Sequence, residues 1–284
     1  MGSGMAGRLL EFGHQLTVYN RTPEKAASLV DRGARLATSP RAAADGASAV
    51  FVMVSDDQAS RAVWQGDDGV LAAELAPGAL AIECSTLSHG WVRKLSVAVH
   101  DRGLRYLDCP VTGLPDAAAA GRLTLLIGAD AVDLQDAGPL LLALSDDQLH
   151  FGPVGAGTVY KLIINLMGAV QIAAAAEGMA LAERAGLDLD QVARAIAAGQ
   201  AASPQVVRNS RRMADGDHEH DVVFSGRLRR KDAEYGVRLA DTLGVPAPFG
   251  RAALDGLDRL LAMGLGDANE SSIIDVARRS GTAD

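Results

Sequence analysis

The hydrophobic pattern of this chain changes near residue 153. Before that point, short apolar runs alternate with helical patterns; after it, only helical periodicities follow. Strands separated by helices favour a largely parallel sheet covered on both faces. We therefore predict an α/β domain over residues 1–153 and an all-helical domain over residues 154–284, entered by a long connecting helix.

The individual elements follow from the same pattern. Apolar runs rich in β-formers predict strands, and longer runs with 3.6-residue periodicity predict helices. The expected strands are 15–19, 49–54, 79–85, 105–111, 123–128 and 148–151. The expected helices are 23–32, 87–102 and 131–144 in the first half, and 156–185, 188–200, 226–243 and 247–264 in the second.

Composition narrows the class of protein. The net charge of −8 argues against a nucleic-acid surface. The two cysteines, Cys84 and Cys109, are too few for a disulfide framework and indicate a reducing cytoplasm, each as a small apolar residue ending a buried strand. No signal peptide is visible, and the most apolar stretch, 162–176, is too short and too polar to span a bilayer. We expect a soluble cytoplasmic protein with no membrane partner and no metal site.

Lys161 is the first candidate for chemistry. It follows Gly155 and Gly157 and precedes Asn165 by four residues, which places Lys161 and Asn165 on one helix face. The chain has 23 arginines and only four lysines. Unlike arginine, a partly desolvated lysine can release its proton and act as a general acid or base. A lysine that merely extends to solvent along an apolar helix remains the alternative interpretation.

The first seven residues match the G-x-G-x-x-G dinucleotide fingerprint, but no strand precedes them. If Gly2 is instead the third glycine of the fingerprint, a helix over residues 3–12 buries Met5, Leu9 and Phe12. In that register the first strand and the first two glycines lie upstream of Met1. We therefore expect the native polypeptide to begin upstream with a short apolar strand.

The expected strand 15–19 is followed by Asn20, Arg21 and Thr22. With the first strand expected upstream of Met1, this is the second strand of the dinucleotide fold. An NAD site usually has an acidic residue there, whereas an arginine accommodates the extra phosphate of NADP. Neutral donors beside a cation, with no carboxylate, favour NADP over NAD. Thr22 could also serve as a helix N-cap before Pro23.

Four segments, in order along nearly the whole chain, resemble the beta-hydroxyacid dehydrogenase family, which includes 3-hydroxyisobutyrate dehydrogenases and tartronate semialdehyde reductases. The start, Gly2 with Met5, is similar to the end of the family's cofactor fingerprint. The segment 108–113, Asp-Cys-Pro-Val-Thr-Gly, resembles the substrate motif. Gly155-x-Gly157-x-x-x-Lys161-x-x-x-Asn165 resembles the catalytic motif. Lys231-Asp232 resembles a fourth, cofactor-side motif.

The resemblance implies a Rossmann-like domain followed by an all-helical domain, in a homodimer or homotetramer. It implies hydride transfer between NADP or NAD and a small carboxylate bearing a hydroxyl or an aldehyde. By motif position, Lys161 exchanges the proton of the substrate oxygen, Asn165 orients the substrate, and Thr112 and Gly113 hold its carboxylate. The residues expected at the cofactor are Gly2, Met5, Asn20, Arg21, Thr22, Val54, Ser55, Thr86 and Lys231. For Ser55 and Thr86, capping of a loop is an equally good interpretation.

One departure from the family pattern affects substrate choice. Thr112-Gly113-Leu114 stands where family members commonly have Ser-Gly-Gly, so Leu114 adds bulk where a second glycine would let backbone approach a ligand.

Two other functions compete with this one. An imine reductase shares the architecture but usually lacks the motif lysine, so Lys161 argues against it. A non-catalytic NADPH-binding protein would bind the cofactor without turnover.

Overall fold

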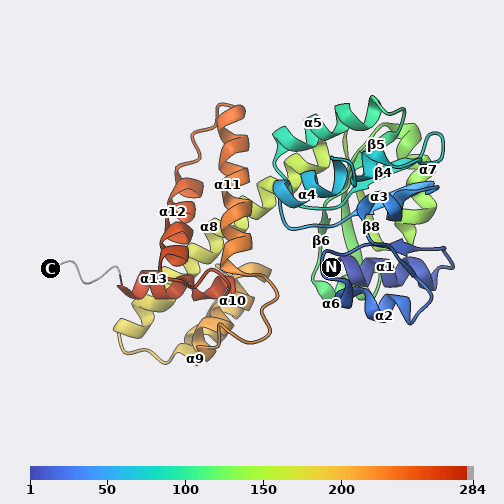
Figure 1. Ribbon diagram of the computed structural model, residues 1–284. Coiled ribbons are helices and arrows are strands. Elements are labelled where there is room, and N and C mark those ends of the chain that lie inside the picture. The colour runs from blue at the N-terminus through green and yellow to red at the C-terminus, as the bar shows by residue number, and fades with distance from the viewer. Residues whose placement is uncertain (280–284) are drawn as a thin grey trace. The chain divides into compact units, whose positions relative to one another are not determined.

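The computed structural model describes residues 1–279, in two compact units: Met1–Lys161, and a second that begins at Leu162. The first is an α/β unit and the second is built from helices (Figure 1). The division falls inside one continuous helix, α8 (Ala156–Arg184).

The chain opens with helix α1 (Gly2–Glu11), close to the 3–12 helix that the second fingerprint register requires. Met5 and Leu9 are buried as predicted. The prediction that Phe12 is buried is wrong, because Phe12 lies one residue beyond the helix and its ring, 53% exposed, is covered on one side by the Arg8 guanidinium.

A mixed six-stranded sheet forms the centre of the first unit, with β3 (Ala49–Val52), β4 (Leu80–Glu83) and β5 (Arg105–Asp108) parallel to one another. Strand β7 (Leu123–Gly128) is antiparallel to β5 and to β6 (Val111–Thr112), and parallel to β8 (Ser145–Gly152). The strand order is β3-β4-β5-β7-β6, with β8 on β7. A second, two-stranded parallel sheet pairs β1 (Thr17–Val18) with β2 (Arg35–Leu36), which the sequence pattern did not predict.

Helices cover both faces of the six-stranded sheet, and an apolar core lies between the helices and the sheet on each face (Figure 1). One core joins α1, α6 (Pro115–Ala119) and α7 (Ala131–Leu142) to the sheet. The other joins α3 (Pro40–Ala44), α4 (Asp57–Trp64) and α5 (His89–His100), and includes both tryptophans, Trp64 and Trp91. The remaining elements of this unit are η1 (Pro23–Ala26), α2 (Ala27–Val30) and η2 (Val70–Ala72).

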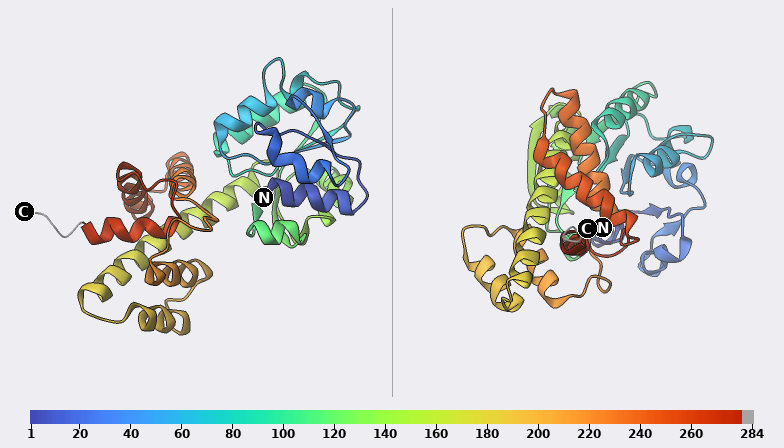
Figure 2. Two further views of the ribbon diagram at one scale, coloured as in Figure 1. Left: turned by 60° about the horizontal axis from the view of Figure 1, so that its bottom comes forward. Right: turned by 90° about the vertical axis from the view of Figure 1, so that its left-hand side faces the viewer.

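The second unit confirms the predicted helices and adds others. After α8 come α9 (Leu189–Ala198), α10 (Pro204–Asp215), α11 (Gly226–Thr242), α12 (Pro248–Ala262), η3 (Glu270–Ile273) and α13 (Ile274–Arg279). Helices α9 and α10 lie side by side, as do α11 and α12 (Figure 2). Helix α10 was not predicted, because its polar, arginine-rich sequence carries a weak apolar signal.

Helix α8 has 29 residues, and by length and composition it could cross a bilayer. The prediction that this stretch is too short for that is therefore wrong. Part of this apolar surface packs inside the second unit, where Ile172, Ala176 and Met179 belong to the same core as Leu257 of α12.

Candidate functional site

The carboxyl ends of β3 and β4 lie side by side and bring together three residues that the sequence predicts at the cofactor. Val54 and Ser55 follow β3, and Thr86 follows β4. The two loops are tied by hydrogen bonds. The Val54 amide donates to Ser85 Oγ at 2.7 Å, and the amide and hydroxyl of Ser88 donate to the Asp57 carboxylate at 2.8 and 2.6 Å. In open α/β sheets, ligands bind outside this end of the strands.

The N-terminus of α1 lies at the same edge. A Cβ built on Gly2 would stand 3.6 Å from the Met53 side chain, just beyond the end of β3. The first amides of a helix, together with its dipole, favour an anion. Gly2 is half-buried and Met5 is buried, so Met5 serves the apolar core under this helix. The first amides of α1 could therefore hold the pyrophosphate of a dinucleotide at this edge.

Asn20, Arg21 and Thr22 follow β1, as predicted. Asn20 Nδ2 donates to the carbonyl of Thr22 at 2.7 Å and so shapes the turn. Thr22 is in the N-cap position of η1, but its side chain makes no capping hydrogen bond. The capping interpretation therefore does not account for the Thr22 hydroxyl, and the Arg21 side chain is exposed.

Thr112 and Gly113 end β6, where Thr112 pairs with Thr124 of β7. Gly113 has φ +132°, and a Cβ there would approach Leu123 Cδ2 to 2.8 Å, so only glycine fits this turn. Leu114 is exposed and precedes Pro115, the first residue of α6.

Asp108, at the end of β5, fixes the start of α8. Its carboxylate accepts hydrogen bonds from the amides of Gly155 at 2.5 Å and Thr158 at 2.7 Å. Burial raises the pKa of Asp108, while these two donors act in the opposite direction. Gly157 lets the helix approach β7, because a Cβ there would overlap the Leu126 carbonyl. Asp108 opens the segment 108–113 that resembles the substrate motif, and its contact with the start of α8 was not predicted.

Lys161 and Asn165 lie one turn apart on α8; Lys161 is half-buried and Asn165 is buried. Asn165 Nδ2 donates to Asp232 Oδ2 of α11 at 2.6 Å. An ionised carboxylate only accepts hydrogen bonds, so this contact fixes which end of the Asn165 amide faces Asp232. The Asn165 oxygen therefore points away from Asp232, as an acceptor.

Lys231, the fourth predicted element of the site, pairs with the same carboxylate. Its Nζ is 2.9 Å from Asp232 Oδ1 and 5.3 Å from the centre of the Tyr235 ring. Asp232 thus joins Lys231 to Asn165. Sequence reasoning missed this role, although the adjacency of Lys231 and Asp232 was a visible signal.

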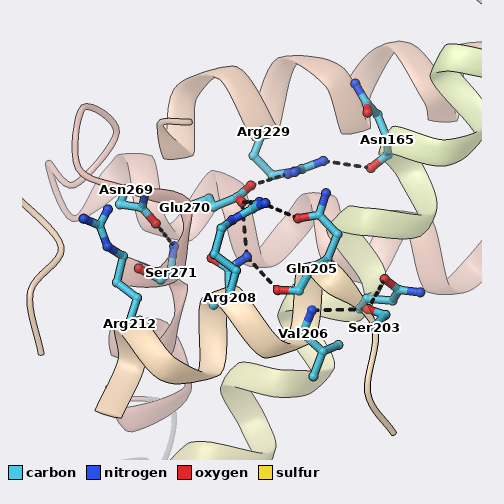
Figure 3. A network of polar contacts seen from close by, with 12 residues as sticks. Asn165, Ser203, Gln205, Val206, Arg208, Arg212, Arg229, Asn269, Glu270 and Ser271 are labelled. Carbon is cyan, nitrogen blue, oxygen red and sulfur yellow. Dashed lines mark hydrogen bonds and ion pairs between the residues drawn. The ribbon is translucent and has the colours of Figure 1, made fainter. Parts of the chain in front are cut away.

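A buried ionic network holds the main chain at Asn165 (Figure 3). Arg229 Nη1 donates to the Asn165 carbonyl at 3.2 Å, and Arg229 Nε donates to Glu270 at 2.6 Å. Glu270 also accepts from Arg208 at 2.9 Å and from Asn209 at 3.2 Å. Helix α8 is therefore held at Asn165 through both its side chain and its backbone.

A cavity of about 260 Å³ borders this network and is lined by residues that include Arg208, Arg212, Phe224 and Glu270. None of the residues predicted for substrate or cofactor lines it.

Cys84 and Cys109 are buried free thiols at the ends of β4 and β5, as predicted. A hydrogen bond with the neighbouring Cys109 thiol is the largest cause that raises the pKa of Cys84 well above its usual value, and burial adds to it.

Two family models together match nearly the whole chain. Residues 1–154 match the family described as the NAD binding domain of 6-phosphogluconate dehydrogenase. Residues 155–277 match the family described as NAD-binding of NADP-dependent 3-hydroxyisobutyrate dehydrogenase.

Full-length relatives are similar over nearly the whole chain. An NAD-dependent L-serine dehydrogenase of Pseudomonas aeruginosa is 35% identical and covers 96% of this chain and 93% of its own. The crystal structure of 3-hydroxyisobutyrate dehydrogenase from Salmonella typhimurium is 28% identical, with a TM-score of 0.88, covering 97% of this chain and 95% of that one. A Mycobacterium tuberculosis 3-hydroxyisobutyrate dehydrogenase structure with L-serine is 28% identical, with a TM-score of 0.85, covering 98% and 96%.

The fold and these matches define an oxidoreductase with a Rossmann-like NAD(P)-binding domain followed by a helical domain. The chain belongs to the beta-hydroxyacid dehydrogenase family, whose members act on CH–OH groups with NAD(P).

Proposed function

We propose that this enzyme interconverts a small beta-hydroxy carboxylate and its semialdehyde, in the manner of a 3-hydroxyisobutyrate or L-serine dehydrogenase. The observation that carries the proposal is the Asn165–Asp232 hydrogen bond one helical turn after Lys161. It presents an amide oxygen as an acceptor on the helix that carries the candidate proton-transfer group.

In this proposal Lys161 takes the proton of the substrate hydroxyl during oxidation and returns it during reduction. Asn165 orients that hydroxyl through its amide oxygen, and Thr112 and Gly113 hold the substrate carboxylate. Lys231, paired with Asp232, lies near the nicotinamide. The cofactor supplies the hydride acceptor.

The assignment of the cofactor site rests on the edge formed by α1, β3 and β4, with Gly2, Met5, Val54, Ser55 and Thr86. We propose NADP as the preferred cofactor over NAD, since no carboxylate follows β1 at Asn20, Arg21 and Thr22 to repel the extra phosphate.

We further propose a cytoplasmic homodimer or homotetramer with no membrane or nucleic-acid partner. The net charge of −8 and the buried free thiols support the compartment and the absence of nucleic acid. Exposed apolar side chains on α8 support self-association.

The proton-transfer role is tested by replacing Lys161. Lys161→Ala should lower kcat by roughly two to four orders of magnitude, the usual contribution of a general acid or base. Lys161→Arg should be nearly as slow, because arginine keeps the charge but cannot release the proton. The NADPH dissociation constant of both variants should stay within a few-fold of wild type.

Substrate and cofactor are identified with purified wild-type enzyme. L-serine, 3-hydroxyisobutyrate and tartronate semialdehyde are each assayed with the NADP and NAD couples, and a cyclic imine serves as the comparison substrate. The proposal would be contradicted if the enzyme reduces the imine and Lys161→Ala reduces it as fast as wild type. Binding of NADPH with no turnover of any substrate would favour a non-catalytic role.

A further inference from the structure

A buried carboxylate lies directly below the proposed cofactor edge. Glu83 is the last residue of β4 and is 1% exposed. Its Oε2 accepts hydrogen bonds from Trp64 Nε1 at 2.7 Å and from Ser60 Oγ at 2.9 Å, and its Oε1 accepts from the Ser85 amide at 3.1 Å. Trp91 Nε1 donates to Ser60 at 2.9 Å, so both tryptophans of the chain belong to this cluster.

Ser85 connects this cluster to the neighbouring loop. Its amide donates to Glu83 Oε1 at 3.1 Å, and hydrogen bonding by Ser85 lowers the pKa of that carboxyl against the effect of burial. The Ser85 hydroxyl oxygen accepts the Val54 amide at 2.7 Å. Ser85 therefore connects the buried Glu83 carboxyl to the main chain at Val54.

The bond to Val54 comes just past the point where the strand ladder ends. Val52 pairs with Glu83 in the last register of β3 and β4, and the Cys84 amide donates to the Val52 carbonyl at 2.8 Å. Strand β3 ends at Val52, and beyond it a side chain, Ser85, supplies the partner of the Val54 amide. Without Ser85, this partly buried amide would lose its hydrogen-bond partner.

We propose that Ser85, held by Glu83, is a positioning residue for the nicotinamide cofactor. It fixes the peptide at Val54 and Ser55 in the conformation that receives the cofactor. Ser85 is 1% exposed, so it acts through this peptide and does not itself touch the cofactor. The inference rests on the proposed placement of the cofactor at Val54 and Ser55.

Ser60 offers a matched control. Ser60 is as buried as Ser85, at 0% exposed. Its hydroxyl binds the same Glu83 carboxyl and accepts from Trp91, and neither of these contacts involves Val54 or Ser55. Ser85→Ala and Ser60→Ala therefore each remove one hydroxyl from the same cluster. We expect similar falls in melting temperature for the two variants.

Cofactor affinity should separate them. Titration calorimetry with NADPH should show a dissociation constant raised roughly tenfold for Ser85→Ala, the scale of one lost hydrogen bond. The constant for Ser60→Ala should stay within about twofold of wild type. In steady state, Ser85→Ala should raise the KM for NADPH and leave kcat at saturating NADPH nearly unchanged.

Equal weakening by both variants, or wild-type affinity in folded Ser85→Ala, would overturn the positioning role. If Ser85→Ala does not fold, Ser85→Cys takes its place with the same two outcomes, since its thiol fills the space but hydrogen-bonds weakly. Failure of wild-type enzyme to bind either NADPH or NADH would instead refute the proposed function itself.

Discussion

At the scale of single residues, Glu83 shows how burial and hydrogen bonding compete. Burial raises the pKa of Glu83, and the hydrogen bonds from Ser85, Trp64 and Ser60 only partly oppose it. The carboxyl therefore holds its proton to higher pH in the native state than in the unfolded chain, where the ordinary value is 4.5. Its contribution to stability is full below that value and is lost as pH rises through the native pKa.

This gives a pH-dependent prediction. Glu83→Gln cannot ionise, so its free energy of unfolding should gain on that of wild type as pH rises from 4 to 8. Urea unfolding of both proteins at several pH values measures the difference, in which the other titrating groups largely cancel. A difference that stays constant, or moves the opposite way, would mean that the native pKa of Glu83 is not raised.

At the scale of elements, α8 is fixed by charged groups from other segments. Asp108 of the first unit binds its first amides, and Arg229 and Asp232 of α11 hold it at Asn165. Arg229 and Glu270 are only 3% and 1% exposed. Replacing Glu270 would leave the Arg229 charge buried without this carboxylate, which typically costs about 3–5 kcal/mol.

A double-mutant cycle tests this tether. Glu270→Gln should destabilise by about 3–5 kcal/mol, and Arg229→Met by less, because Glu270 keeps its ion pair with Arg208. The double variant should lose clearly less than the sum, because the Arg229 charge that Glu270→Gln alone leaves buried is then absent. Denaturant unfolding measures all three proteins. The exposed pair Arg259–Asp255 is the control and should couple by less than about 1 kcal/mol. Additive losses at Arg229 and Glu270 would show that the two charges are not coupled.

At the scale of the whole molecule, one face of α8 is apolar and exposed. Ile163 is 45%, Met167 55% and Leu181 70% exposed. Large exposed apolar side chains in series along a helix mark a contact surface. A second copy of this chain is the proposed partner.

We therefore expect wild-type enzyme to have a solution mass that is a multiple of 29.4 kDa. Leu181→Asp should shift the population toward smaller species, because it places a charge in the apolar contact. Val97→Asp, at an equally apolar exposed site on α5, is the control and should not. Light scattering after size-exclusion chromatography measures each mass. A wild-type mass of one chain would contradict self-association.

The periodicity of apolar residues determined much of the fold. It predicted the strands β3, β4, β5, β7 and β8 and the helices α5, α7, α8, α9, α11 and α12 to within a few residues, because each buries a regular apolar face. It did not separate β6 from β5, since the expected strand 105–111 covers β5 and the start of β6. It missed α4, α6 and α10, whose short or polar sequences carry little of that signal, and β2, which is only two residues long.

The motifs also put Lys161 beside Asn165 and Lys231 beside Asp232, because adjacency and helical spacing are local properties. Only the tertiary structure decided what these residues contact. Three contacts join segments that are 31 to 67 residues apart in the sequence. They are the contact of Asp232 with the Asn165 amide, of Asp108 with the start of α8, and of Ser85 with Val54. Such pairings are selected when the chain buries its polar groups, since each buried donor or acceptor must then find a partner, and no local pattern records which one.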